Sequence, residues 1–126
     1  MKVKHIMTEN VVTIKGDDTA ESAIITLYEK HIGSVVIVDN KGKCEGIFTT
    51  RDVLRLIAQK TSLKTSINNV MTKSPITIRD TGSFSEAISL ISSNGIRHLP
   101  VVDVNDRLIG ILSIRCFLEG IIGLSH

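Results

Sequence analysis

The stretch Gly46-Ile47-Phe48-Thr49-Thr50-Arg51-Asp52 returns later in the chain as Gly110-Ile111-Leu112-Ser113-Ile114-Arg115-Cys116. The match extends on both sides of this stretch, so that residues 1–62 align with residues 65–126 without a gap and 14 of 62 positions are identical. A period this long that covers the chain indicates a duplicated structural unit. The alignment therefore predicts two repeats, 1–62 and 65–126, related by a pseudo-twofold axis and folding together as one body.

The composition excludes several classes of protein. A net charge of +2 is too small to indicate a nucleic-acid or membrane partner through charge alone. Aromatic residues make up only 3% with no Trp, so a stacking platform for single-stranded bases is absent. There is no run of about 18 apolar residues and no signal-peptide pattern, so we expect a cytoplasmic location.

The sequence also argues against an enzyme. Cys44 and Cys116 fall at unrelated positions of the two repeats, which favours free thiols over a disulfide or a metal site. No paired carboxylates, Ser-His-Asp set or metal-ligand cluster occurs at usable spacing. We expect no catalysis, no cofactor and no metal, while Cys116 at a helix start leaves a redox role open beside the simpler one of a buried thiol.

Each repeat is predicted to follow the order β-α-β-β-α, which indicates an α/β (α+β) body with small sheets and helices outside them. We expect Gly33 to end the first helix and Val53, Leu54 and Ile57 to form the apolar face of the second. A polar stretch, 59–69, should link the halves. The expected elements are strand 11–14, helix 20–31, strands 35–38 and 45–49 and a helix from Thr49 or Thr50, then strand 76–78, helix 84–94, strands 99–102 and 108–112 and helix 114–122.

The opening stretch, 46–52, could carry chemistry. A helix N-terminus is a ready anion site, and a hydroxyl with an Arg beside it suits phosphate. Asp52, one turn into the helix, could accept hydrogen bonds from a ribose diol. The same Thr49-x-x-Asp52 spacing is also a helix cap that needs no ligand. The residues alone leave both interpretations open.

Taken together, the repeats resemble the cystathionine-β-synthase (CBS) domain, and the pair is similar to a CBS tandem, or Bateman module. The resemblance covers 3–122 and rests on Met-Thr before each first strand, on Ile-Arg-His-Leu-Pro-Val-Val-Asp at 96–103 and on the stretch 46–52. It implies a regulatory module that binds AMP, ADP or ATP, or else S-adenosylmethionine or NAD. It also implies a homodimer that controls a separate, unknown protein.

The resemblance further implies two ligand clefts, each built from both repeats. In the preferred one, Asp52 would hold the ribose, Thr49 a phosphate or ribose oxygen, and the strand backbone near Ile76 would read the edge of the adenine. Isoleucine side chains would sandwich the base, and Arg97, His98 and Arg115 would meet phosphates. The preferred set is Ile47, Thr49, Asp52, Pro75, Ile76, Arg97, His98, Pro100 and Arg115.

The second cleft departs from the family pattern. It has Cys116 where the first has Asp52, and Gly33-Ser34 where the first has Arg97-His98. We therefore expect it to be empty or weaker. Its set is Val11, Val12, Gly33, Ser34, Val36, Arg51, Ile111, Ser113 and Cys116.

Two alternatives stay open. Arg97 and His98 could be ordinary surface residues beside a strand. Separately, the chain could be a structural or interaction subunit that dimerises and has vestigial clefts. The apolar stretch 117–124 suits a dimer interface, but it suits packing against its own chain equally well.

Overall fold

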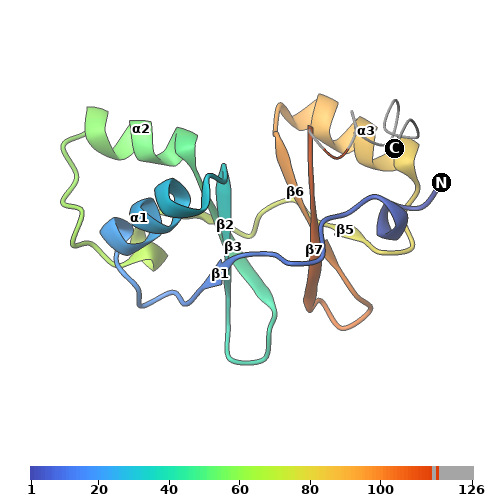
Figure 1. Cartoon of the computed structure of the whole chain (residues 1–126), viewed down its shortest axis with the longest axis horizontal. Helices are drawn as coiled ribbons and strands as arrows, with labels where there is room; N and C mark the ends of the chain where they lie inside the picture. Colours follow the sequence, from blue (N-terminus) through green and yellow to red (C-terminus); the bar gives the residue numbers. More distant parts are fainter. Residues whose placement is uncertain (115, 117–126) are drawn as a thin grey trace. The chain divides into compact units, whose positions relative to one another are not determined.

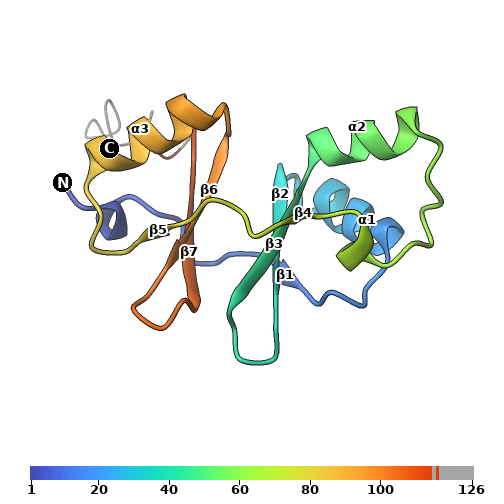
Figure 2. The ribbon, with the colours of Figure 1, turned by 180° about the vertical axis from the view of Figure 1, so that it is seen from behind.

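The structure is a computed structural model that describes residues 1–114 and 116, and its contacts form two compact units. Unit I is Val12–Pro75, and unit II joins Met1–Val11 to the described part of Ile76–His126. The leading segment of each sequence repeat therefore packs in the unit that the rest of the other repeat forms. The two units are traced in Figures 1 and 2.

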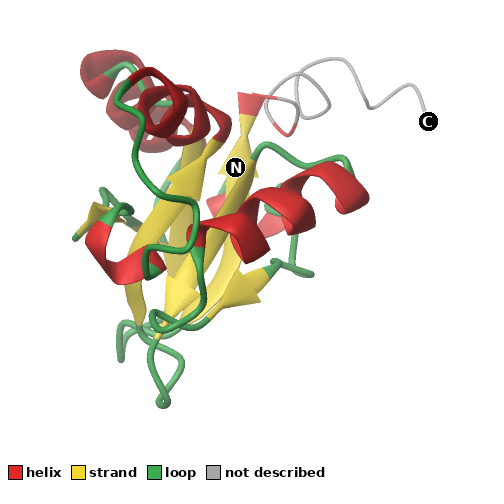
Figure 3. Cartoon of the chain, turned by 90° about the vertical axis from the view of Figure 1, so that its left-hand side faces the viewer, coloured by secondary structure: helices red, strands yellow, loops and turns green. Residues whose placement is uncertain are grey.

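Unit I is a four-stranded sheet, in the order β1-β2-β3-β4, covered by helices. Strands β1 and β2 are parallel, and the other pairs are antiparallel. Helices are red and strands yellow in Figure 3. The elements are β1 (Thr13–Ile14), α1 (Ala20–Lys30), β2 (Ser34–Val38), β3 (Cys44–Thr49), α2 (Thr50–Ala58), the 3-10 turn η2 (Ile67–Asn69) and β4 (Thr72–Lys73).

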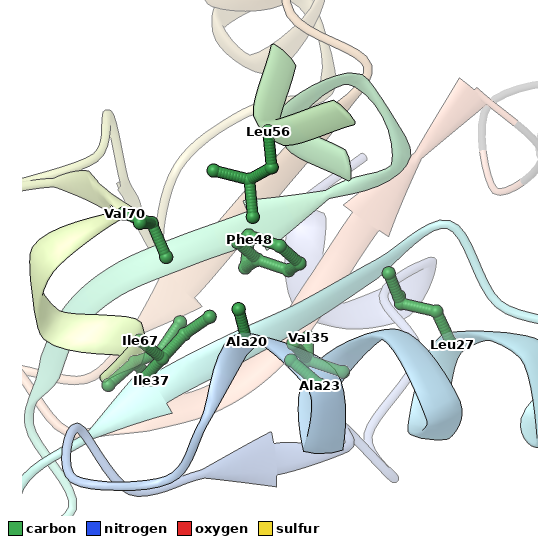
Figure 4. Close-up of a cluster of buried hydrophobic side chains, with 9 residues drawn as sticks. All are labelled: Ala20, Ala23, Leu27, Val35, Ile37, Phe48, Leu56, Ile67 and Val70. Carbon is green, nitrogen blue, oxygen red and sulfur yellow. The ribbon is translucent and has the colours of Figure 1, made fainter. Parts of the chain in front are cut away.

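The core of unit I lies between its helices and one face of the sheet. Helix α1 begins after Thr19, whose Oγ1 accepts the N–H of Ser22 at 3.1 Å, as an N-cap does. Its buried residues repeat at helical spacing, as expected, and point at the strands (Figure 4). The cluster consists of Ala20, Ala23, Leu27, Val35, Ile37, Phe48, Leu56, Ile67 and Val70.

The end of α1 differs from the prediction. The helix stops at Lys30, and His31, not Gly33, takes the left-handed conformation with φ 53°. The equivalent residue of unit II, Gly95, has φ 60°. In both units the next residue closes the helix in the same way. The N–H of Ile32 donates to the carbonyl of Leu27 at 3.2 Å, and the N–H of Ile96 donates to that of Ile91 at 3.2 Å. The prediction that Gly33 ends the helix failed because His31, which is not a glycine, adopts the left-handed conformation two residues earlier.

The predicted apolar face of α2 is right at Val53 and wrong at Leu54 and Ile57. Leu54 and Ile57 are 68% and 63% exposed, whereas Leu56 is fully buried and Val53 packs against the core. At 100° per residue, Leu56 shares a face with residues 52 and 53, and Leu54 lies opposite it. The helix enters the core through Asp52, Val53 and Leu56.

Unit II repeats the plan of unit I with a three-stranded sheet, β5-β6-β7. Its β6–β7 register pairs His98 with Ser113, as β2–β3 pairs Ser34 with Thr49, which confirms the repeat at the level of single residues. The predicted last helix, 114–122, lies outside the described residues except for Ile114 and Cys116. The elements are η1 (Val3–His5), β5 (Ile78–Arg79), α3 (Phe84–Asn94), β6 (His98–Val102) and β7 (Leu108–Ser113).

The exchanged leading segments are the feature that sequence reasoning missed. The N–H of Ile67 donates to the carbonyl of Asp18 at 2.7 Å, and the N–H of Val3 donates to that of Gly82 at 2.9 Å. Both donors are fully buried in their units. The stretch predicted as a polar link, 59–69, is thus bonded into unit I by its second half.

Within residues 1–114 and 116, no helix has the length and hydropathy needed to span a membrane. Cys44 and Cys116 are both free thiols.

Candidate ligand-binding site

The candidate residues on the strands lie on the sheet face turned away from the helices. Side chains alternate along a strand, and the residues between the core positions of β2 and β3 form this second face. In unit I it carries two cross-strand pairs, Ser34 with Thr49 and Val36 with Ile47. Val36 is fully buried and Ile47 is 7% exposed. Residues predicted for the preferred and the second site are therefore direct neighbours on one sheet.

Asp52 lies in the first turn of α2, where its carboxylate is largely bonded within the protein. Oδ2 accepts the N–H of Thr49 at 2.8 Å and the Thr49 hydroxyl at 3.3 Å. Oδ1 accepts from Nη2 of Arg55 at 3.1 Å, and Asp52 is 8% exposed. An ionised carboxylate has about four acceptor positions, of which these three donors leave one. The capping interpretation of Thr49-x-x-Asp52 is confirmed. A ribose diol would find a second acceptor position on the carboxylate if the 3.3 Å hydrogen bond from the Thr49 hydroxyl were broken.

Arg55 is a residue that sequence reasoning missed. Its Nη2 also donates to the carbonyl of Val70 at 2.6 Å, so the guanidinium joins α2 to the segment after η2. The signal was available in the alignment of the repeats. Where Asp52 becomes Cys116, Arg55 becomes Glu119, so the acid and its cation are lost together.

The second face of unit II carries His98 and Pro100, which pair with Ser113 and Ile111 across β7. Pro100 is fully buried, while His98 is partly buried beside the exposed Arg97. Burial, with a smaller contribution from the Arg97 charge, holds the pKa of His98 below its ordinary value of 6.5. The imidazole is therefore neutral near pH 7, and the charge of a bound anion would act against the effect of Arg97.

The other members of the preferred set are placed as follows. Pro75 is the last residue of unit I, and Ile76, which is 36% exposed, is the first of unit II after the division. Arg115 lies outside the described residues. The structure thus brings Ile47, Thr49 and Asp52 together within unit I, and His98 and Pro100 together within unit II.

In the second set, Cys116 takes the structural place of Asp52. Its Sγ lies 3.5 Å from Thr8 Oγ1 and 3.6 Å from Ser113 Oγ, and the residue is 7% exposed. A thiol is a weak hydrogen-bonding group and has no carboxylate charge to offer a diol. The other difference in the alignment also favours the preferred set, because Gly33 and Ser34 carry no charge or imidazole, whereas Arg97 supplies a cation and His98 a ring N–H donor.

The remaining residues of the second set lie on several different segments of the two units. The Val12 side chain packs against the core on the helix side of unit I, so only the Val12 backbone could contact a ligand on the opposite face of the sheet. The Gly33 carbonyl accepts the N–H of Thr50 at 3.2 Å, and Arg51 is exposed on α2. Val11 belongs to unit II. Among the described residues, no three His, Cys, Asp or Glu side chains are grouped to hold a metal ion.

Comparison with known sequences matches the CBS domain family twice, at residues 3–59 and 67–123. Inosine-5′-monophosphate dehydrogenase of Methanocaldococcus jannaschii is 35% identical over 118 residues, which is 94% of this chain and 23% of that protein. An uncharacterized protein of Methanopyrus kandleri, MK0525, is 34% identical, with 94% of this chain and 62% of that protein covered. The chain spans less than two thirds of both relatives. For an uncharacterized 17.7 kDa protein of Acidianus ambivalens, at 32% identity, the shares are 90% and 69%.

Solved structures match over nearly the whole chain. CBSX2 in complex with AMP has a TM-score of 0.89 at 27% identity and covers 99% of this chain and 98% of its own. PAE2072 of Pyrobaculum aerophilum, complexed with AMP, has a TM-score of 0.90 at 27% identity, covering 99% and 97%. The CBS domain pair of MJ0100, with 5-methylthioadenosine and S-adenosyl-L-methionine, has a TM-score of 0.89 at 27% identity, covering 98% of both. With two matches that span most of its length, the chain belongs to the CBS domain family and carries two CBS domains in tandem.

Proposed function

We propose that this chain is a regulatory module that binds an adenosine-containing nucleotide with residues of both CBS repeats and controls a partner protein in trans. The observation that carries the proposal is the Asp52 carboxylate, held at the start of α2 by the Thr49 N–H at 2.8 Å and present in only one repeat. AMP and S-adenosylmethionine in the related structures support the ligand class.

In this proposal each group of the preferred set has one task. Asp52 accepts the ribose hydroxyls at its free acceptor position and at the one released when the Thr49 hydroxyl turns to the ligand. Ile47 supplies an apolar wall for the base. Arg97 and His98 meet the phosphates, for which charge-assisted hydrogen bonds are strong. AMP, ADP and ATP are the first candidates.

A screen of melting temperatures tests the proposal. A ligand that binds only the folded state adds about 2.7 kcal/mol of stability at 100 times its dissociation constant. We expect a rise with at least one of AMP, ADP, ATP, NAD and S-adenosylmethionine, and its loss in Asp52→Ala. Asp17→Ala removes an exposed carboxylate of the same unit and should keep the rise. The proposal also expects no turnover of any of these compounds.

A structural or interaction subunit is the second candidate, and one observation favours it. Thr49 and Arg55 already satisfy most of the Asp52 carboxylate, so this residue has a role without any ligand. If millimolar concentrations of all five compounds leave the melting temperature unchanged, this candidate replaces the first.

The homodimer and the cytoplasmic location stay predictions. The stretch on which the dimer prediction rested, 117–124, lies outside the described residues. Light scattering at micromolar concentration should give twice the mass of 13.8 kDa, and the mass of a single chain would end the dimer prediction.

A further inference from the structure

Arg55 holds two acceptors of unit I with a single nitrogen. Its Nη2 donates to Oδ1 of Asp52 at 3.1 Å and to the carbonyl of Val70 at 2.6 Å. Both acceptors belong to buried residues, since Asp52 is 8% and Val70 is 6% exposed. The carbonyl lies outside α2, so the guanidinium fixes the carboxylate against a segment that is not part of its own helix.

Without Arg55, the helix cap would hold only one oxygen of the Asp52 carboxylate. Oδ2 accepts both the N–H and the hydroxyl of Thr49, which fills its two acceptor positions. Within the described part of the chain, Oδ1 accepts from Arg55 alone and keeps the free position of the carboxylate. The terminal torsion of an aspartate is soft, so the oxygen that remains open to a ligand is the one whose place Arg55 determines.

The second contact of Arg55 connects this carboxylate to the strands of the sheet. Val70 lies two residues before Thr72 of β4, and Thr72 pairs with Ile47 of β3. Ile47 supplies the apolar wall for the base in the proposed function. Arg55 thus links the carboxylate on α2 to the strand pair that carries this wall. A nucleoside must meet both at once, which requires that their supporting groups be held precisely.

We propose that Arg55 is the positioning residue for ribose recognition, because it holds Oδ1 of Asp52 in the orientation that accepts a ribose hydroxyl. This inference rests on the proposed function and adds a residue that acts through Asp52 without touching the ligand. The repeats agree with it. Where the acid becomes Cys116, the residue aligned with Arg55 is Glu119, whose carboxylate has no N–H to donate.

Two nucleotides test the inference by titration calorimetry: AMP, and 2′,3′-dideoxyadenosine 5′-monophosphate, which lacks both ribose hydroxyls. We expect the wild type to prefer AMP and Arg55→Met to reduce this preference. When the carboxylate is no longer held, the ligand must order it, which lowers the affinity for AMP by a factor of about 2 to 10. The dideoxy nucleotide has no hydroxyl for Asp52, so its affinity should stay nearly constant.

The ratio of the two affinities separates positioning from stability. A partly unfolded variant loses apparent affinity for both nucleotides by the same factor, so the ratio does not change. Arg55→Lys should keep most of the preference, since one nitrogen makes both bonds and a lysine ammonium has three donors. Lys64→Met removes an exposed cation of the same unit and should leave the ratio at the wild-type value.

Several results would overturn the inference while the wild type still binds AMP. An unchanged ratio in Arg55→Met would show that the cap alone positions Asp52, and a higher ratio would show that Arg55 competes with the ribose for Oδ1. Equal reductions in Arg55→Met and Arg55→Lys would assign the effect to the shape of the arginine and not to a donor at Oδ1. A wild type that binds no adenosine nucleotide would end the proposed function, and the inference with it.

Discussion

Arg55 holds Asp52 through a contact of 3.1 Å between Nη2 and Oδ1, and the same nitrogen donates to the carbonyl of Val70 at 2.6 Å. Arg55→Met should lower the free energy of unfolding by about 1–2 kcal/mol, because it leaves a buried carboxylate and a buried carbonyl short of a donor. The expected loss of stability is small because the Arg55 side chain is 41% exposed, and solvent screens its charge. Urea denaturation measures the change. Lys64→Met removes an exposed cation of the same unit, and equal losses in both variants would contradict the role of Arg55.

Met71 packs over Gly46, and Met7 packs over Gly110 in the equivalent place of unit II. A Cβ at Gly46 would overlap the Met71 side chain, so Gly46→Ala should cost about 1–3 kcal/mol of stability by overpacking. Shortening the methionine should relieve the clash. In the double variant Gly46→Ala with Met71→Ala, we therefore expect a loss at least about 0.5 kcal/mol smaller than the sum of the single losses. Additive losses would show that the two residues do not share this contact.

His31 and Gly95 occupy equivalent helix ends with φ 53° and φ 60°. A left-handed conformation costs an L-residue about 1–2 kcal/mol, and glycine avoids that cost but gains entropy when unfolded. His31→Gly should therefore raise the melting temperature slightly, and Gly95→Ala should lower it. Differential scanning calorimetry of the two variants measures these opposite shifts. Destabilisation by His31→Gly would mean that the imidazole makes a contribution larger than the backbone strain.

His98 should make stability depend on pH below neutrality. Its pKa lies below 6.5 in the folded protein because burial, and then the Arg97 charge, disfavours the cation. Between the folded pKa and 6.5 the unfolded chain binds more protons, so this residue lowers stability as the pH falls through that window. His98→Gln should flatten the profile of unfolding free energy between about pH 7.5 and pH 5. An unchanged difference between pH 7.5 and pH 5 would show that His98 is not the titrating group.

Much of the fold could be predicted because it depends on neighbours in sequence. The helix 84–94 and the strands 35–38 and 99–102 follow from short patterns, and the structure has them to within one residue. The prediction failed where two faces of one helix are both apolar. Leu54 and Ile57 satisfy helical spacing as well as Leu56 does, and only the position of the sheet selects Leu56.

The candidate site likewise has residues that the sequence predicted and residues that it did not. Asp52, Thr49 and their capping contact were evident from spacing, because a cap is formed by residues three apart. Arg55 was not, because the partner that fixes it, the Val70 carbonyl, is fifteen residues away in sequence.

By itself, the sequence determined that this protein is a duplicated CBS pair whose repeats differ at Asp52 and Cys116, since identity, spacing and local capping are properties of nearby residues. Only the tertiary structure decided that Val3 and Ile67 complete the core of the other repeat's unit and that Arg55 holds Asp52. These features depend on hydrogen bonds and burial between segments far apart in the chain. Such contacts are set by how the strands pair, and the periodicity of one segment does not record its partner in space.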